Sequence, residues 1–247
     1  MASEEGLEFR GGRLDDADFS GVRLHGPNFE GTRITDGWLR NADICGFIEG
    51  LRVNGVEVAP LVGAELDRRF PERVKLRAAE PPGLGGAWTM IEDLWRATVA
   101  RAMALPEPLL HERVDGEWSF TETLRHLVFA TDCWLLRMIR QAPGPYHRWG
   151  LAGSWLTDPA SLGIDPDANP SLSEVLQVRR GRMDTVRDTI AAVTADDLER
   201  VCIPPPTPGH PTQAHSVLHC LHVILNEEWE HSRYANRDLD ILAARKP

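Results

Sequence analysis

An apolar residue recurs every five residues through the first part of the chain, and an unbroken period of this kind indicates a repeat architecture. The repeated residues are Phe9, Leu14, Phe19, Leu24, Phe29, Ile34, Leu39 and Ile44. Small residues stand two places before several of them, for example Ala17 before Phe19 and Ala42 before Ile44. A solenoid generally needs several stacked units and caps, so a segment this short is expected to need support from another part of the chain.

On this pattern, residues 7 to 50 resemble the pentapeptide-repeat family. The resemblance implies a four-sided, right-handed β-helix of about two coils, with the central Leu or Phe side chains stacked inside. Residues 51 to 58 are predicted to close this segment as a β-hairpin, because Asn54-Gly55 favours a type I′ turn. Long pentapeptide proteins mimic duplex DNA, and two coils are too short for that role.

Beyond Leu61 the apolar residues recur with the period of helices, and four helices are expected. The first contains Trp88, Ile91, Leu94, Trp95, Thr98, Val99 and Ala102 and stops at Pro106; the second runs from Ser119 to about Arg140; the third from Ser171 or Ser173 to near Val193; the fourth from about Thr212 to Ala243. Between the second and third helices, residues 143 to 170 form a long loop with Tyr146, Trp149 and Trp155, typical of a lid or a packed Ω-loop.

The expected fold class is therefore mainly α, an up-down four-helix bundle preceded by a short right-handed β-helix and a β-hairpin. Residues 1–58 would form the repeat segment with its hairpin, residues 59–82 a helical connector, and residues 83–247 the bundle. The stretch from Pro71 to Gly86 is rich in Pro and Gly and is expected to be exposed at the domain boundary.

Charge and cysteine content exclude several classes of protein. Thirty-seven acidic residues against 27 basic ones give a net charge of −10, which disfavours nucleic-acid partners. No targeting segment or long uncharged apolar run is visible, so a cytoplasmic protein without a membrane partner is expected. The four cysteines form no Cys-x-x-Cys pair and are expected to be reduced thiols, with Cys133 and Cys220 in the core.

Two helical segments resemble the DinB-like family of metal-binding four-helix bundles. The segment from Glu117 to Leu127 contains the Trp-Ser pair that opens the second helix in this family, followed by His126. The segment from His222 to His231 matches the fourth helix, where the common form is His-x-x-x-His; here Glu227 stands in place of the first His. The resemblance implies a divalent metal, Zn, Ni, Mn or Fe, held by His126, Glu227 and His231.

The spacing of these residues suits such a site. Glu227 and His231, four residues apart, lie on one helical face, and His126 would reach the same ion from a facing helix. Two His and one carboxylate leave coordination positions open, as in reactive sites. Each half alone has ordinary interpretations, a surface ion pair for Glu227 and His231 or a core histidine for His126. Glu122, one turn before His126, is equally compatible with orienting that imidazole and with a capping box on Ser119.

A second histidine stripe on the fourth helix, His215, His219 and His222, also has ligand spacing. Its face differs from the one that carries Cys220, Val223, Glu227 and His231, which includes the apolar positions expected to point inward. The alternative for the stripe is that it consists of helix-end and interface histidines.

The resemblance further implies a thiol S-transferase, or an isomerase of the same chemistry, that uses a low-molecular-weight thiol of the mycothiol or bacillithiol type. Its other substrate would be a small-molecule electrophile beneath the loop of residues 143 to 170, and a homodimer is compatible with the family. Two alternatives stay open: a metal-dependent hydrolase with Glu227 as base, and a non-enzymatic metal-binding stress or interaction protein.

Overall fold

A computed structural model describes residues 7–24 and 26–245 of the chain. Its contacts divide the chain into two compact units, Met1–Trp38 and Leu39–Pro247, which are considered separately. The expectation of a mainly α fold is confirmed, since helices account for most of the regular structure of the second unit. None of the described helices combines the length and the apolar character that crossing a bilayer requires.

The repeat segment keeps its five-residue period in the backbone. A positive φ angle recurs at Gly11, Asp16, Gly21, Gly26, Gly31, Asp36, Asn41 and Gly46. Turn hydrogen bonds run from the N–H of Gly12, Val22 and Thr32 to the carbonyl oxygens of Phe9, Phe19 and Phe29, at 2.9 to 3.1 Å. The described residues between 7 and 50 contain turns and extended backbone without an assigned strand, so the β-helix remains a prediction.

The central apolar side chains of the repeats are not stacked in a closed interior, contrary to the expectation. Phe9, Leu14, Phe19, Leu24, Phe29, Ile34, Leu39 and Ile44 each expose between 53% and 64% of their surface. In a solenoid, a side chain is buried by the layers above and below it. In the predicted stack of about two coils, each side chain would have at most one such neighbour, which would account for the exposure.

The predicted hairpin is confirmed. Strands β1 (Arg52–Val53) and β2 (Val56–Glu57) pair antiparallel, with Arg52 opposite Glu57 and Val53 opposite Val56. Asn54 and Gly55 connect them with φ angles of 49° and 80°. Two consecutive positive φ angles define the type I′ turn that the Asn-Gly pair favours.

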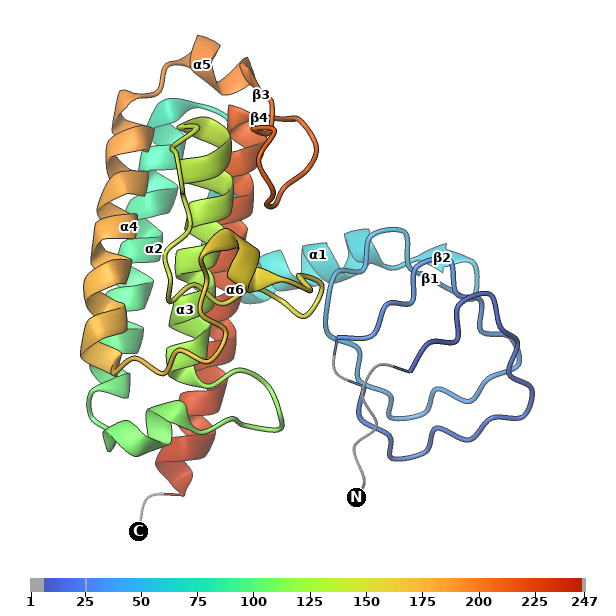
Figure 1. The fold of residues 1–247 in the computed structure, drawn as a ribbon. Helices are drawn as coiled ribbons and strands as arrows, with labels where there is room; N and C mark the ends of the chain where they lie inside the picture. The colour runs from blue at the N-terminus through green and yellow to red at the C-terminus, as the bar shows by residue number, and fades with distance from the viewer. Residues whose placement is uncertain (1–6, 25, 246–247) are drawn as a thin grey trace. The chain divides into compact units, whose positions relative to one another are not determined.

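The remaining elements follow in chain order (Figure 1). They are α1 (Ala59–Arg69), the 3-10 helix η1 (Pro71–Arg77), α2 (Pro81–Ala102), the 3-10 helix η2 (Glu107–His111), α3 (Phe120–Thr131), the π-helix η3 (Asp132–Ile139), the 3-10 helix η4 (Pro159–Leu162), α4 (Leu172–Ala192), α5 (Ala195–Glu199), β3 (Val201–Cys202), β4 (His215–Ser216) and α6 (Val217–Ala244).

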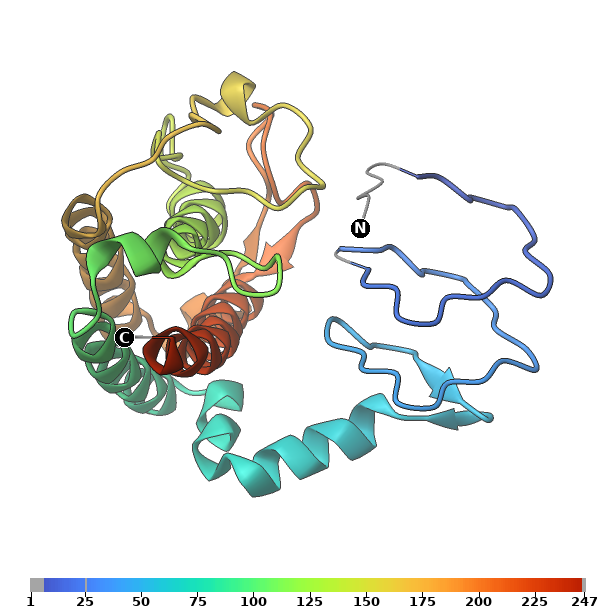
Figure 2. The ribbon, with the colours of Figure 1, turned by 90° about the horizontal axis from the view of Figure 1, so that it is seen from below.

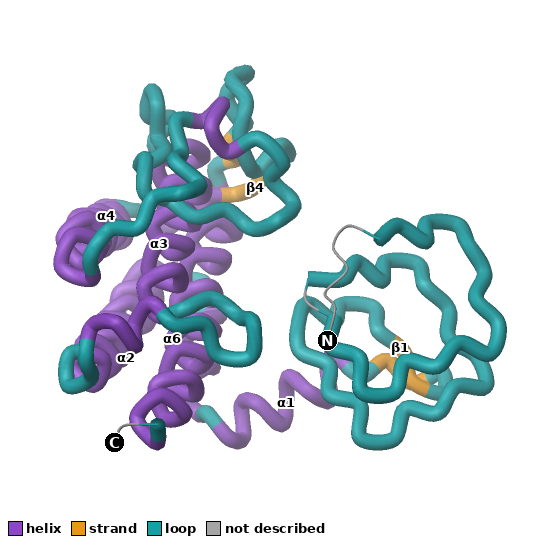
Figure 3. The backbone as a smooth tube through the Cα atoms, turned by 60° about the horizontal axis from the view of Figure 1, so that its bottom comes forward, coloured by secondary structure: helices purple, strands orange, loops and turns teal. Residues whose placement is uncertain are grey.

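Four long helices, α2, α3 with its continuation η3, α4 and α6, lie side by side around one apolar core (Figures 2 and 3). Helices α2 and α3 each pack against both α4 and α6, so α4 and α6 face each other across the core. Trp88, Ile91, Leu124 and Trp229 are among the core side chains that are almost fully buried.

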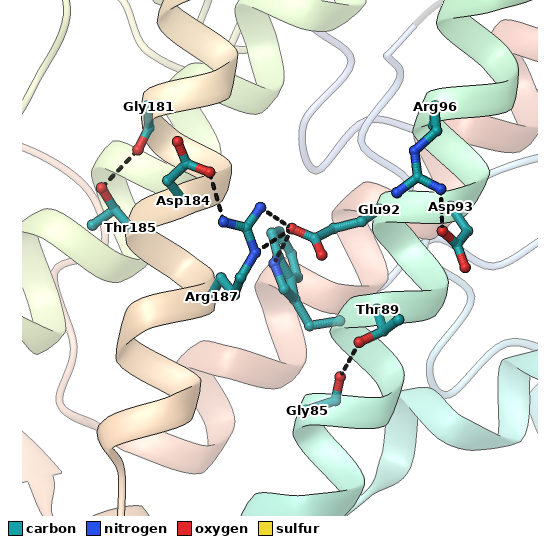
Figure 4. Close-up of polar contacts among 10 residues, drawn as sticks. Gly85, Thr89, Glu92, Asp93, Arg96, Gly181, Asp184, Thr185 and Arg187 are labelled. Carbon is teal, nitrogen blue, oxygen red and sulfur yellow. Dashed lines mark hydrogen bonds and ion pairs between the residues drawn. The ribbon is translucent and has the colours of Figure 1, made fainter.

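A polar contact also joins α2 to α4. Arg187 on α4 donates from Nε to Oε1 of Glu92 on α2 at 2.8 Å, and also pairs with Asp184 on its own helix (Figure 4). The indole Nε1 of Trp88 donates to the same Glu92 oxygen at 3.1 Å. The carboxylate of Glu92 therefore links the core tryptophan to the arginine of the neighbouring helix.

Helical turns occupy the Pro- and Gly-rich stretch from Pro71 to Gly86, namely η1 and the first turns of α2. Most of its residues are exposed or half-buried, as expected. Pro81 can begin a helix, since the first helical position needs no N–H donor. Leu84 is fully buried. A Cβ atom on Gly83 would lie 2.8 Å from the Cβ atom of Ala78, so this glycine allows the two segments to approach closely. Gly83 therefore permits close packing here, whereas a Cβ atom on Gly85 or Gly86 would meet nothing within 4 Å.

Two further boundaries differ from the expectation. The second helix changes to π-helical hydrogen bonding at Asp132, which periodicity alone does not reveal. The fourth helix begins at Val217 instead of about Thr212, because His215 and Ser216 pair with Cys202 and Val201 in a short hairpin. All four cysteines are free thiols, and the predicted core positions of Cys133 and Cys220 are confirmed.

Candidate metal centre

The N-terminus of α3 fixes the position of His126. Ser119 caps the helix by accepting from the N–H of Glu122 at 3.2 Å, and the Glu122 carboxylate accepts from the N–H of Ser119 at 2.8 Å. This capping box stabilises the first turn that carries the sequence onward to His126. Trp118, the residue before the cap, packs on the His126 ring with 4.4 Å between ring centroids.

Helix α6 brings Glu227 and His231 to the same point. The Glu227 Oε2 atom lies 3.3 Å from Nε2 of His126 and 3.2 Å from Nε2 of His231. Ligand atoms held about 2.1 Å from a tetrahedral metal ion are about 3.4 Å apart, so these separations fit a shared divalent ion. Among the described residues, His126, Glu227 and His231 form a group of potential metal ligands whose donor atoms all lie within 4.8 Å of one another.

A backbone carbonyl determines which nitrogen of His126 is available. Nδ1 lies 2.9 Å from the carbonyl oxygen of Leu151, and because that oxygen can only accept, Nδ1 carries the proton. In the neutral ring, Nε2 then has a lone pair directed at the Glu227 carboxylate. Two lone pairs at this distance repel each other unless a proton or a metal cation lies between them, so the arrangement is compatible with a bound cation.

The carboxylate is the most accessible of the three groups. Glu227 exposes 34% of its side chain, while His126 and His231 expose 13% and 17%. Burial would raise the pKa of the Glu227 carboxyl, but the two imidazoles outweigh that effect and hold this pKa well below its usual range. Glu227 is therefore ionised at neutral pH, as a ligand must be.

Hydrogen bonds hold the part of the long loop just before the Leu151 carbonyl against the helices. The buried Arg125 donates from Nε to the carbonyl oxygen of Trp149 at 2.9 Å, and its own carbonyl accepts from the N–H of Leu151. The buried Asp132 accepts from the N–H of His147 at 2.7 Å and from Nε of Arg182 at 2.5 Å. Sequence reasoning did not identify these anchors; a charged residue inside an otherwise apolar helical stripe was their only signal.

Aromatic rings surround the His126 side of the centre. Besides Trp118, the ring of Phe129 lies 6.3 Å from the His126 ring. Phe129 in turn contacts Tyr146 at 5.8 Å and Trp155 at 6.1 Å, both from the loop. The loop of residues 143 to 170 thus packs its aromatic rings on Phe129, which lies next to His126.

The second histidine stripe is engaged elsewhere. The rings of His215 and His219 stack on each other at 4.4 Å and both contact Trp134, while His222 bonds through Nε2 to the carbonyl oxygen of Ala78 at 2.8 Å. Glu122, whose role was open, is held by the capping box and by Arg113, whose Nη2 lies 2.6 Å away. The structure thus favours the capping role for Glu122, and the Leu151 carbonyl makes the orienting contact to His126.

Comparison with known protein families shows which family the chain belongs to. The family model of the DinB superfamily matches residues 90–235, which is more than half of the 247-residue chain and includes all three candidate ligands. No curated protein and no solved structure gives a match. Proteins of this superfamily generally bind metal, in agreement with a His/Glu group that could hold an ion. On the strength of the family match, the chain belongs to the DinB superfamily.

Proposed function

We propose that this protein is a metal-dependent enzyme that transfers a low-molecular-weight thiol, of the mycothiol or bacillithiol type, to an electrophilic small molecule. The observation that carries the proposal is the convergence of Nε2 of His126 and Nε2 of His231 on Oε2 of Glu227. A divalent cation held there, Zn, Ni, Mn or Fe, would lower the pKa of a thiol bound at a vacant coordination position.

The side chains have distinct roles in this proposal. His126, Glu227 and His231 hold the cation, and the Leu151 carbonyl keeps the His126 ring in the tautomer that offers Nε2. The rings of Trp118, packed on His126, and Trp155, packed on the buried Phe129, supply an apolar surface on the His126 side. Such a surface limits water and favours an electrophile with an apolar or aromatic body. The same arrangement would serve an isomerase that adds and removes the thiol.

Glu227 is assigned as a ligand in preference to a general base. Its Oε2 atom is nearly equidistant from the two imidazole nitrogens, at 3.3 and 3.2 Å, as expected for three groups around one ion. A base that serves a metal-activated water would be expected beside the ligand set. The hydrolase alternative therefore has less support.

The architecture proposed for this function is an up-down four-helix bundle, supported by the packing of α2, α3, α4 and α6. A right-handed β-helix for the repeat segment is supported by its five-residue backbone period. A cytoplasmic protein that does not bind nucleic acid is in keeping with the net charge of −10. The proposal also includes a homodimer, and the molar mass measured by light scattering would test it.

The deciding experiment is a thiol-dependence assay on protein loaded in turn with each of the four metals. Consumption of a reactive aromatic electrophile is followed with mycothiol, bacillithiol or no thiol, and the His231→Ala variant serves as the control. The proposal predicts turnover that requires both a thiol and the intact site. Metal-dependent turnover at equal rates without thiol would support hydrolysis instead, and a metal-loaded protein inactive in every combination would support the non-enzymatic alternative.

A further inference from the structure

A polar cavity of about 230 Å³ lies where the first turns of α3 meet η2 and residues 166–169. Its polar lining comes from His111, Thr121, Glu122, Arg125, Asp167 and Asn169. None of the three candidate metal ligands is among its lining residues. This volume is several times what a single water molecule needs, so the cavity has room for a small organic ligand.

Arg125 contributes a buried positive charge to this cavity. Its side chain is 5% exposed, and Nε and Nη2 donate to the carbonyl oxygens of Trp149 and Asp165 at 2.9 and 3.3 Å. Both acceptors are neutral, and no carboxylate of the described residues bonds to this guanidinium directly. A buried cation without a direct counter-ion is costly, so this wall of the cavity favours an anion.

The two acidic residues closest to Arg125 are already engaged. The Glu122 carboxylate is bound by the Arg113 guanidinium through Nε and Nη2 and accepts from the N–H of Ser119. The Asp165 carboxylate accepts from Arg148 and from the N–H of Asp167. The positive end of the α3 dipole, close to Thr121, adds to the attraction for an anion.

Asp167 gives the same cavity a negative group. Its N–H is used in the bond to Asp165, but none of the hydrogen bonds or ion pairs of the described part of the chain involves its carboxylate. An exposed carboxylate can accept from an ammonium group at little cost. The cavity therefore presents to one ligand a cation that no carboxylate of the described residues bonds directly, and a carboxylate that none of their donors engages.

We propose that this cavity binds a small zwitterion of the α-amino-acid type, with its carboxylate on Arg125 and its ammonium group on Asp167. The site is separate from the metal centre and does not depend on the proposed transfer reaction. Specificity arises because a ligand lacking either charge leaves one of the two side chains without its partner.

The test is an amide chemical-shift titration of the full chain with three matched probes, L-serine, 3-hydroxypropionate and ethanolamine. The second lacks the ammonium group of serine and the third lacks its carboxylate. L-serine should cause saturable shifts at the amides of Thr121 and Asn169, with an affinity at least about tenfold above that of either analogue. Titrating metal-free and metal-loaded protein separates this result from the fate of the metal proposal.

Variants then assign the contacts. Asp167→Asn should reduce the affinity for L-serine to that for 3-hydroxypropionate, and Arg125→Gln should abolish serine binding. Asp188→Asn, an exposed change on α4 outside the cavity, should leave the affinity unchanged. Circular dichroism checks whether Arg125→Gln folds, and if it does not, the serine affinity of Asp167→Asn tests the proposal by itself. Equal affinities for the three probes, no saturable shift with L-serine, or full serine affinity in Asp167→Asn would overturn the proposal.

Discussion

Replacing Glu228 by Gln should destabilise the protein strongly, because Glu228 forms a buried ion pair across the core. Nη1 and Nη2 of Arg179 on α4 bond to Oε1 and Oε2 of Glu228 on α6, at 2.6 and 2.8 Å. The two side chains are only 3% and 1% exposed. The Arg179 guanidinium also lies 5.2 Å from the centre of the Trp95 ring.

The magnitude follows from this burial. Glu228→Gln keeps the shape but leaves the Arg179 cation without a counter-charge, which typically costs about 3–5 kcal/mol. Replacing both partners by apolar residues, Arg179→Met with Glu228→Leu, removes both buried charges, and such exchanges are typically neutral or stabilising by about 1–4 kcal/mol. The double variant is therefore expected to be more stable than Glu228→Gln, although it departs further from the native sequence.

Urea unfolding at neutral pH, followed by circular dichroism, measures these differences. Asp93→Asn, which breaks an exposed pair with Arg96 on α2, is the control and should change stability by less than about 1 kcal/mol. The reasoning is refuted if Glu228→Gln costs no more than this control, or if the apolar double variant is the least stable of the three.

Burial raises the pKa of Asp132 to about 6 from its ordinary 3.8. The protonated carboxyl group therefore stabilises the fold fully below about pH 4, and this contribution is lost as pH rises through 6. Asp132→Asn should remove about 3 kcal/mol of this pH dependence from urea unfolding curves, and an unchanged pH dependence would contradict this prediction. Gly83→Ala should destabilise the protein by about 1–3 kcal/mol, because the new Cβ atom would lie 2.8 Å from that of Ala78. In the control Gly85→Ala, the new Cβ atom meets nothing within 4 Å, so this change should stabilise α2 by up to about 1 kcal/mol. Equal shifts of the two melting temperatures would disprove the clash. Glu227→His should keep metal and shift the pH–activity profile toward acid, because the site becomes more positive; full metal with negligible activity at every pH would exclude the ligand role.

Periodicity and capping residues predicted the helices well, because a helix that buries one face must repeat its apolar positions. Ser119 was predicted to start the second helix, and Ser171 or Ser173 the third; Ser119 and Ser171 form capping boxes in the structure. The start of α2 was missed because the Pro- and Gly-rich stretch was interpreted as an exposed domain boundary. Gly83 is instead required by close contact with Ala78, a constraint that only the three-dimensional arrangement reveals.

The three candidate ligands could be predicted because spacing on α6 and the Trp-Ser opening of α3 are local features. The Leu151 carbonyl could not, since a backbone atom of a loop has no sequence signature. The same holds for the Asp132 contact to the N–H of His147, which depends on how the loop returns to the helices. The expected burial of Phe9 and its equivalents failed because stacking needs more layers than about two.

The most direct test of the account is the metal content of untagged protein, measured by elemental analysis on the wild type and on three single variants. We expect about one divalent ion per chain in the wild type, at least a tenfold drop in bound metal for His126→Ala and for His231→Ala, and nearly no change for His219→Ala, whose ring stacks on His215. Loss of the ion in His219→Ala to the same degree would move the site to the second stripe. A wild-type protein that binds no divalent ion would contradict a metal centre at His126, Glu227 and His231.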